Sequence, residues 1–216
     1  MLPVFVGRIH RREVRATRGL DSQVQGQSNW PIAFAMWSTT MKDVIKRKVL
    51  NVFSMLKRDD GTLFDCEIEE SEYDSRKLHE VCINHRLAIY LEKEILPIIS
   101  SASQKYFVDI EFNREGINLK KILECNGRER VVRPDIIIHN RKSEEKKENF
   151  LIVECKKIGA SPAEIHDDRE KVSAFLNDEK YKYSFGLQVV YGKDVIEGTL
   201  FYKDSEGFIK QEKITS

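Results

Sequence analysis

Long apolar runs are missing from this chain of 216 residues. A helix that spans a bilayer needs roughly 18 consecutive apolar residues, and the longest apolar stretch near the start, residues 31–37, is much shorter. Residues 1–20 are rich in arginine and do not resemble a secretory signal. We therefore expect a cytoplasmic protein with no membrane partner.

Cysteine is also scarce. The four cysteines lie far apart and include no Cys-x-x-Cys pair, and no two histidines have the spacing of zinc ligands. This pattern excludes the common zinc-finger and disulfide frameworks. We expect free thiols in a reducing compartment.

The chain carries almost no net charge. At +1, its balance of acidic and basic residues neither favours nor excludes a nucleic-acid partner. Residues 1–19 do hold five arginines and one glutamate. Such an arm can contact phosphates, although a disordered tail is the simpler interpretation. Hydrophobic residues make up 41% of the chain, enough for a core in one domain with an extension.

The hydrophobic pattern changes abruptly near Met41. Residues 19–40 have no clear period, whereas the apolar residues that follow recur at helical spacing. We expect residues 1–40 to be an N-terminal extension, either disordered or not native to the protein, and residues 41–216 to form the folded domain.

Within that domain, periodicity predicts an ordered series of helices and strands. In chain order they are a helix from Met41 to Asp60, a helix over 75–96 that ends at Pro97, strands over 106–111, 130–139 and 149–156, a helix from Ser161 to Asn177, a strand over 185–191, and a terminal hairpin of 199–203 and 208–213.

Two of the predicted strands carry an acidic residue where strands seldom do. Asp135 is followed by three isoleucines, and Glu154 is preceded by Leu-Ile-Val. Such continuous apolar runs are typical of strands that are covered on both faces. Burying an unpaired carboxylate costs several kcal/mol, and a divalent cation is one partner that offsets this cost for two carboxylates at once.

The expected strand pairing brings these acids together. Side chains alternate along a strand, so Glu154 and Lys156 share one face. If the two strands form a hairpin, Asp135 and Glu154 converge on one point. Two carboxylates with several waters suit Mg²⁺ or Mn²⁺, because these hard cations prefer oxygen ligands.

Arg133-Pro134-Asp135 on one strand and Glu154-Cys155-Lys156 on the next, in the order helix, strand, strand, strand, helix, strand, resemble the PD-(D/E)XK nuclease superfamily. The resemblance implies a restriction-endonuclease-like α/β fold, with a mixed central sheet flanked by helices. Its core would cover about residues 75–191, with an added N-terminal helix and C-terminal β-hairpin. It also implies metal-dependent phosphodiester hydrolysis, but it indicates no particular substrate. We expect DNA rather than RNA.

The same resemblance implies roles for particular residues. Asp135, Glu154 and the backbone carbonyl of Cys155 would hold the metal, and Lys156 would orient the attacking water or stabilise developing charge. Glu80, on the helix before the strands, is a candidate third carboxylate ligand. A glutamate favoured near a helix N-terminus by the dipole is an equal alternative for Glu80.

A narrower likeness concerns the helix that contains His85-Arg86-Leu87-Ala88 and the strand around Asp109. Both resemble a poorly characterised bacterial group within the superfamily, in which a tyrosine stands where this chain has Arg133.

We expect His85 to be a core histidine rather than a catalytic one, and Arg86 to pair with a buried carboxylate. Asp109 and Glu111 are expected at a solvated edge. Lys171 and Gln188 are weaker candidates for auxiliary site residues.

Two other interpretations stay open. The chain could be a binding module that kept the fold without catalysis, although all three motif side chains are intact. It could also be an unrelated α/β protein with a fortuitous motif, in which case Asp135 and Glu154 would lie on opposite sheet faces. Cleavage of both strands of a duplex would suggest a homodimer, but no interface is identifiable.

Overall fold

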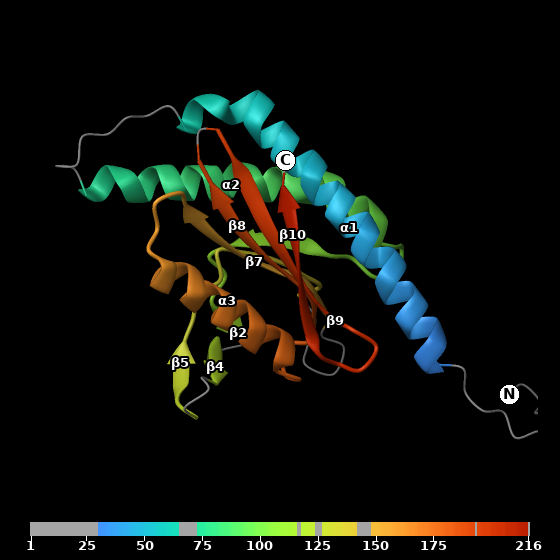
Figure 1. Ribbon diagram of the computed structural model, residues 1–216. Coiled ribbons are helices and arrows are strands. Elements are labelled where there is room, and N and C mark those ends of the chain that lie inside the picture. The colour runs from blue at the N-terminus through green and yellow to red at the C-terminus, as the bar shows by residue number, and fades with distance from the viewer. Residues whose placement is uncertain are drawn as a thin grey trace, which may run out of the picture.

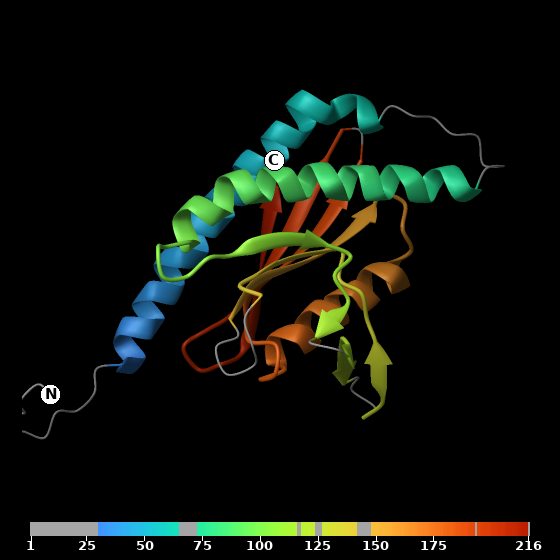
Figure 2. The same cartoon turned by 180° about the vertical axis from the view of Figure 1, so that it is seen from behind.

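A six-stranded mixed sheet forms the centre of the molecule, with helices on both of its faces (Figures 1 and 2). The computed structural model describes residues 30–64, 73–115, 118–123, 127–141, 148–192 and 194–215. The helices are α1 (Trp30–Asp60), the 3₁₀ turn η1 (Gly61–Phe64), α2 (Tyr73–Ile99) and α3 (Pro162–Asn177). The sheet strands are β1 (Phe107–Ile110), β6 (Ile136–His139), β7 (Asn149–Lys157), β8 (Tyr183–Tyr191), β9 (Ile196–Lys203) and β10 (Ile209–Thr215).

The strands lie in the order β1-β6-β7-β8-β9-β10. Every neighbouring pair is antiparallel except β7 and β8, which run parallel. A parallel pair needs a crossover connection, and α3 supplies it. The crossover therefore lays α3 across the face of β7 and β8 (Figure 1).

Two short hairpins are inserted between β1 and β6. They consist of β2 (Arg114–Glu115) with β3 (Asn118–Leu119), and β4 (Lys121–Leu123) with β5 (Glu129–Val131). The β4–β5 hairpin contacts α3 (Figure 2). The Tyr181 hydroxyl anchors it by accepting a hydrogen bond from the amide of Lys121 at 2.8 Å and donating one to the carbonyl of Lys121 at 2.7 Å.

Strand β7 separates two apolar clusters because its side chains alternate. Leu151, Val153 and Cys155 pack into the larger cluster with α1 and α2, whereas Ile152 packs with α3. All four side chains are buried. The strand is thus covered on both faces, as its continuous apolar sequence predicted.

Helix α3 begins with the local chemistry that its sequence predicted. Ser161 caps the helix, its hydroxyl accepts from the amide of Glu164, and the Glu164 carboxylate accepts from the amide of Ser161. Pro162 occupies the first turn, where its missing amide hydrogen costs nothing. This capping box fixes the residue at which α3 begins after the end of β7.

Several predicted boundaries were wrong. The helix expected from Met41 starts at Trp30, and residues 1–29 lie outside the described residues. The division of the chain into an extension over 1–40 and a domain over 41–216 stays a prediction. Helix α2 continues past Pro97 to Ile99. A proline in the last turn removes only one terminal hydrogen bond and does not force the helix to stop there.

The strand expected over 130–139 is two strands, β5 and β6. The segment between them contains Pro134, which has no amide hydrogen to donate to a ladder. The chain changes partner at this point, because β5 pairs with β4 and β6 pairs with β1 and β7. The remaining strands and α3 lie within two or three residues of their predicted positions.

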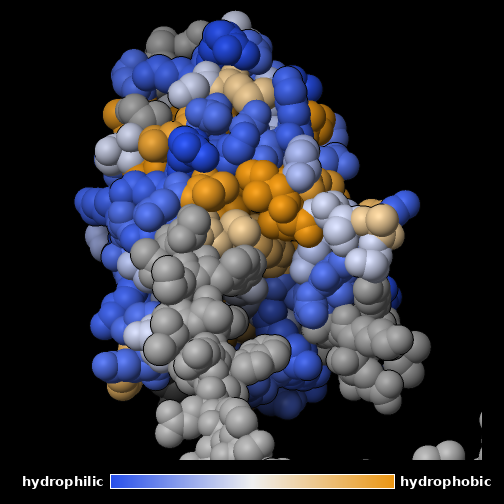
Figure 3. Space-filling model, turned by 90° about the vertical axis from the view of Figure 1, so that its right-hand side faces the viewer, coloured by the Kyte–Doolittle hydropathy of each residue, from blue (hydrophilic) through white to orange (hydrophobic). Residues whose placement is uncertain are grey.

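Polar and charged residues cover most of the surface seen in Figure 3, and an apolar band crosses its middle. Within the described ranges, no helix has an apolar stretch long enough to cross a membrane.

We predict that Gly186→Ala will destabilise the fold. A Cβ at Gly186 would lie 2.2 Å from Cγ1 of Val172, so α3 would have to move away from β8. Overpacking of this kind costs about 1–3 kcal/mol, measurable as a lower midpoint in denaturant unfolding. Gly61→Ala is the matched control, because nothing lies within 4 Å of the added carbon there. Equal stability of the two variants would contradict the close packing of α3 on β8.

Candidate active site

Asp135 and Glu154 lie opposite each other across the β6–β7 pair. The antiparallel register joins Ile136 to Val153, and the next position on each chain brings Asp135 level with Glu154. Asp135 stands one residue before β6, where its carbonyl accepts from the amide of Glu111 at 2.9 Å. Its carboxylate turns towards β7 and accepts from the amide of Cys155 at 2.7 Å. The structure therefore brings the two acids together, as the hairpin predicted.

Glu154 lies beneath α3 and is only 1% exposed. Its Oε2 accepts a hydrogen bond from Nζ of Lys171 on α3 at 2.6 Å. Its Oε1 is buried and has no hydrogen-bond partner in the described structure. The ammonium group of Lys171 therefore bonds one oxygen of this carboxylate, and the other oxygen lacks a hydrogen-bond donor.

Asp168 extends this line of charges and was not predicted. It is 2% exposed, with Oδ1 at 3.3 Å from Nζ of Lys171 and Oδ2 at 3.4 Å from Nζ of Lys156. Alternating acids and bases thus run from Glu154 through Lys171 and Asp168 to Lys156. Its place between the inward-facing Ile165 and Val172, three residues after one and four before the other, is the helical signal that would have found it.

The pKa values of this cluster follow from burial. Desolvation raises the pKa of Asp135 to about 6, although the Cys155 amide and the two lysines work against it. Desolvation and the facing charge of Asp135 raise the pKa of Glu154 well above its usual range. The surroundings of both acids thus disfavour the ionised carboxylate, and shifted pKa values of this kind are common at functional sites.

In the two lysines, the charges of neighbouring carboxylates decide the direction of the pKa shift, and burial does not. Burial alone would lower the pKa values of Lys156 and Lys171. The carboxylates around them outweigh burial, Asp168 first for Lys156 and Glu154 first for Lys171, and both pKa values are raised. Both side chains therefore carry a full positive charge at neutral pH.

Gln188 supports the site without joining it. It lies beside Glu154 in the parallel β7–β8 register. Its amide nitrogen donates to the carbonyl of Ile165 at 2.8 Å, and its oxygen accepts from Nε of Arg169 at 3.0 Å. Because both partners lie on α3, Gln188 fixes the helix that carries Lys171 and Asp168.

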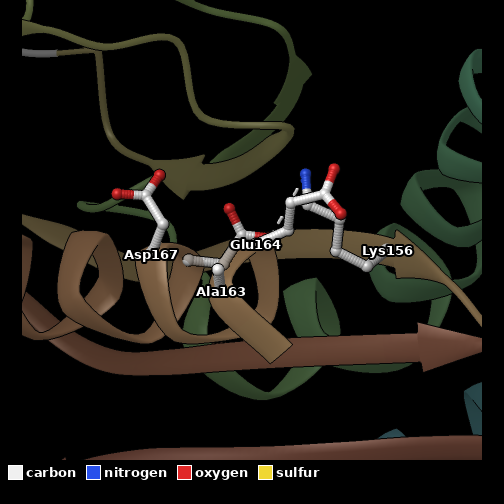
Figure 4. A pocket seen from close by; sticks show the side chains of 5 residues that line it. Lys156, Ala163, Glu164 and Asp167 are labelled. Atoms are coloured by element: carbon white, nitrogen blue, oxygen red, sulfur yellow. Dashed lines mark ion pairs between the residues drawn. The ribbon is translucent and has the colours of Figure 1, made fainter. Parts of the chain in front are cut away.

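A pocket of about 330 Å³ lies beside these charges, lined by Lys156 of β7 and by Ala163, Glu164, Asp167 and Asp168 of α3 (Figure 4). The Arg130 guanidinium, from the β4–β5 hairpin, bonds both carboxylate oxygens of Asp167 at 3.0 and 3.1 Å. The hairpin is therefore attached to α3 beside the pocket.

Glu80 is not joined to the two acids. It lies on α2, across β7 from α3, and is partly buried. Its charge adds to burial and to the charges of Asp135 and Glu154 in raising the pKa of the Cys155 thiol. In the described part of the chain no hydrogen bond links Glu80 to either acid, and no group of three His, Cys, Asp or Glu side chains has the geometry to hold a metal ion.

The other candidates have structural partners or lie at the surface. The interpretation of His85 as a core histidine was wrong, because its side chain is exposed on α2. The apolar stripe that suggested its burial includes Val81 and Ile89, which are 42% and 36% exposed. Arg86 pairs with a carboxylate, as predicted, because its Nε lies 2.9 Å from Oδ2 of Asp60, but this carboxylate is partly rather than fully buried.

Asp109 is partly buried rather than solvated at the sheet edge. It bonds the ring of His139 at 2.6 Å and the Arg141 guanidinium. Burial opposes the ionised form, but these two partners prevail and lower the pKa of Asp109. Glu111 pairs with Arg133 at 3.3 Å on the surface.

Comparisons of the chain with protein-family models, with curated proteins and with solved structures give no match. The geometry described above therefore carries the functional argument.

We predict that Asp135→Asn will stabilise the protein near neutral pH. With a pKa of about 6 when folded, against about 3.9 when unfolded, the folded state holds this proton more tightly. Stability is therefore lost as pH rises from about 4 to 6, by up to about 3 kcal/mol. Asparagine keeps an acceptor for the Cys155 amide and has no charge.

Thermal unfolding should therefore show a higher melting temperature for Asp135→Asn than for wild type at about pH 7.5, and little difference at about pH 4. Asp109→Asn is the matched control. It should be less stable than wild type near neutral pH, because Asp109 is ionised against two partners. A destabilised Asp135→Asn at neutral pH would instead assign Asp135 a purely structural role.

Proposed function

We propose that this chain is a divalent-cation-dependent nuclease of the PD-(D/E)XK type that hydrolyses phosphodiester bonds, in DNA rather than RNA. The observation that carries the proposal is the β6–β7 register, which sets Asp135 level with Glu154. Lys156 follows Glu154 by two residues on β7 and therefore shares its face. Two acids facing each other where β6 begins beside β7, one of them buried and the other partly buried, are costly for stability alone, and a site for a cation explains them.

The order of elements supports the same proposal. Helix α2 is followed by β1, β6 and β7, then by α3 and β8, and the four strands are adjacent in the sheet. This order agrees with the helix-strand-strand-strand-helix-strand order that the resemblance implies, with the two small hairpins inserted after β1. Asp135 stands at the start of the second core strand and Glu154 lies on the third.

The residues fit a magnesium or manganese ion. Glu154 Oε1 is a buried oxygen without a donor, Asp135 faces it, and the carbonyl of Cys155 lies between Glu154 and Lys156 in the chain. Magnesium keeps several waters and is often held by only one or two carboxylates, so a third acidic ligand is not required. When bound, such a cation polarises the phosphate and lowers the pKa of a coordinated water.

Lys156 is the side chain proposed to serve the reaction itself. Its ammonium group reaches the pocket beside α3 and is held by Asp168. A lysine is a compact point charge. In this position it orients the attacking water or stabilises the negative charge that develops on the phosphate.

One observation favours the alternative, an inactive module that binds nucleic acid or protein. The ammonium group of Lys171 already neutralises Glu154, as expected if a positively charged side chain has replaced a metal ion during loss of function. The intact Asp135, Glu154 and Lys156 favour the active enzyme, because a decayed site has no reason to keep all three.

Cleavage assays with Mg²⁺ or Mn²⁺ test the proposal on supercoiled plasmid, linear duplex, single-stranded DNA and RNA. We expect metal-dependent cleavage of DNA by wild type. Glu154→Gln, Asp135→Asn and Lys156→Met should each reduce the rate by roughly 100-fold or more, as removal of an electrostatic catalytic group does.

Lys157→Met is the matched control, because Lys157 is the next residue on β7 and alternates to the other face of the strand. It should retain wild-type activity. Cleavage that survives Glu154→Gln unchanged would refute the proposed site, and the absence of cleavage of any substrate would favour the inactive module.

A further inference from the structure

The most unusual feature of the site is that a lysine already bonds the acid that should bind the metal. Nζ of Lys171 lies 2.6 Å from Glu154 Oε2, and the Lys171 side chain is only 14% exposed. A buried ammonium so close to a carboxylate occupies the electrostatic role that a divalent cation would fill. Lysine and metal ion repel each other, so both cannot hold Glu154 closely without cost.

Asp168 offers Lys171 a second place to bind. Its Oδ1 is already 3.3 Å from Nζ of Lys171, longer than the bond to Glu154. Its Oδ2 is buried, forms no hydrogen bond in the described structure, and lies 3.4 Å from Nζ of Lys156 as an ion pair. A small rotation of the flexible lysine side chain would therefore exchange Glu154 for Asp168 without leaving the ammonium group unpaired.

The charges of the cluster favour this exchange. When all five groups are ionised, three carboxylates (Asp135, Glu154 and Asp168) face two ammonium groups (Lys156 and Lys171), and the metal-free site carries one net negative charge. A divalent cation changes that excess to one positive charge, and a phosphate can then balance it. The cluster therefore attracts a cation first and an anion second.

We propose that Lys171 is a resident competitor of the divalent cation at Glu154, and that Asp168 is the positioning residue that receives Lys171 when the cation binds. Lys171 stabilises the fold while no metal is bound. Metal binding requires the Lys171 ammonium group to move from Glu154 to Asp168. This inference rests on the proposed function, since it assumes that Glu154 binds the cation.

Calorimetric titration of Mn²⁺ into wild type and Lys171→Met tests the competition, with thermal unfolding in the absence and presence of Mn²⁺. The variant should bind Mn²⁺ roughly tenfold more tightly or better, because a repelling charge is removed at contact distance. It should melt at a lower temperature than wild type without metal, because Glu154 loses its ammonium partner and Asp168 loses one of two. Mn²⁺ should restore more of its stability than it adds to wild type.

Two control variants separate competition from a general change of charge. Lys157→Met removes a positive charge from the neighbouring strand position and should bind Mn²⁺ as wild type does. Lys171→Arg keeps the charge and should not gain affinity. Equal or weaker Mn²⁺ binding by Lys171→Met than by wild type would overturn the inference.

A second pair of variants keeps the test decisive if Lys171→Met does not fold. Asp168→Asn should weaken Mn²⁺ binding, because Lys171 then stays on Glu154. Asp167→Asn removes the neighbouring charge, which bonds Arg130, and should leave binding unchanged. Equal affinity of these two variants would contradict the role of Asp168.

The outcomes also distinguish this inference from the proposed function. Metal-dependent cleavage by wild type without tighter binding by Lys171→Met would refute the competition and leave the nuclease standing. A failure of every folded variant to bind Mn²⁺ would refute the metal site, and the competition with it.

Discussion

The pairing of β6 with β7 is the constraint on which the rest of the structure depends. It sets Asp135 level with Glu154 at the centre of a sheet that is covered on both faces. Because β7 and β8 are parallel, the chain must cross over between them, and the crossover brings α3 onto the face that carries Glu154. The register and the crossover together determine the ion pairs of the site. Lys171 from the helix bonds Glu154, and Lys156 from the strand pairs with Asp168.

The energetics of this cluster differ from those of an ordinary buried ion pair. Asp109 has a histidine and an arginine, and its pKa falls. Burial raises the pKa values of Asp135 and Glu154, because the Cys155 amide and the Lys171 ammonium group do not offset the loss of water around the two carboxylates. Natural proteins violate local rules of this kind mainly where function requires it. The unsatisfied oxygen of Glu154, more than the motif itself, is the physical reason to expect a cation there.

Much of this organisation could be predicted from the sequence, because periodicity and capping are local. The pattern around Glu154 predicted a doubly covered strand, and Ser161-Pro162-Ala163-Glu164 predicted the start of α3 to the residue. The inward position of Asp168 could have been read from its spacing to Ile165 and Val172. The ion pairs that Asp168 and Lys171 make with β7 depend on how α3 packs over that strand, which no local pattern encodes. The burial of His85 was predicted wrongly for the same reason, because either stripe of α2 could have faced the sheet.

The central claim is that Asp135 and Glu154 hold a divalent cation together. Diffraction from crystals soaked in Mn²⁺, with anomalous scattering measured at the manganese edge, tests it most directly. The account predicts a single strong peak between the two carboxylates and near the carbonyl of Cys155, with the Lys171 side chain moved onto Asp168. No peak at this place in saturating Mn²⁺, with Lys171 still bonded to Glu154, would contradict it.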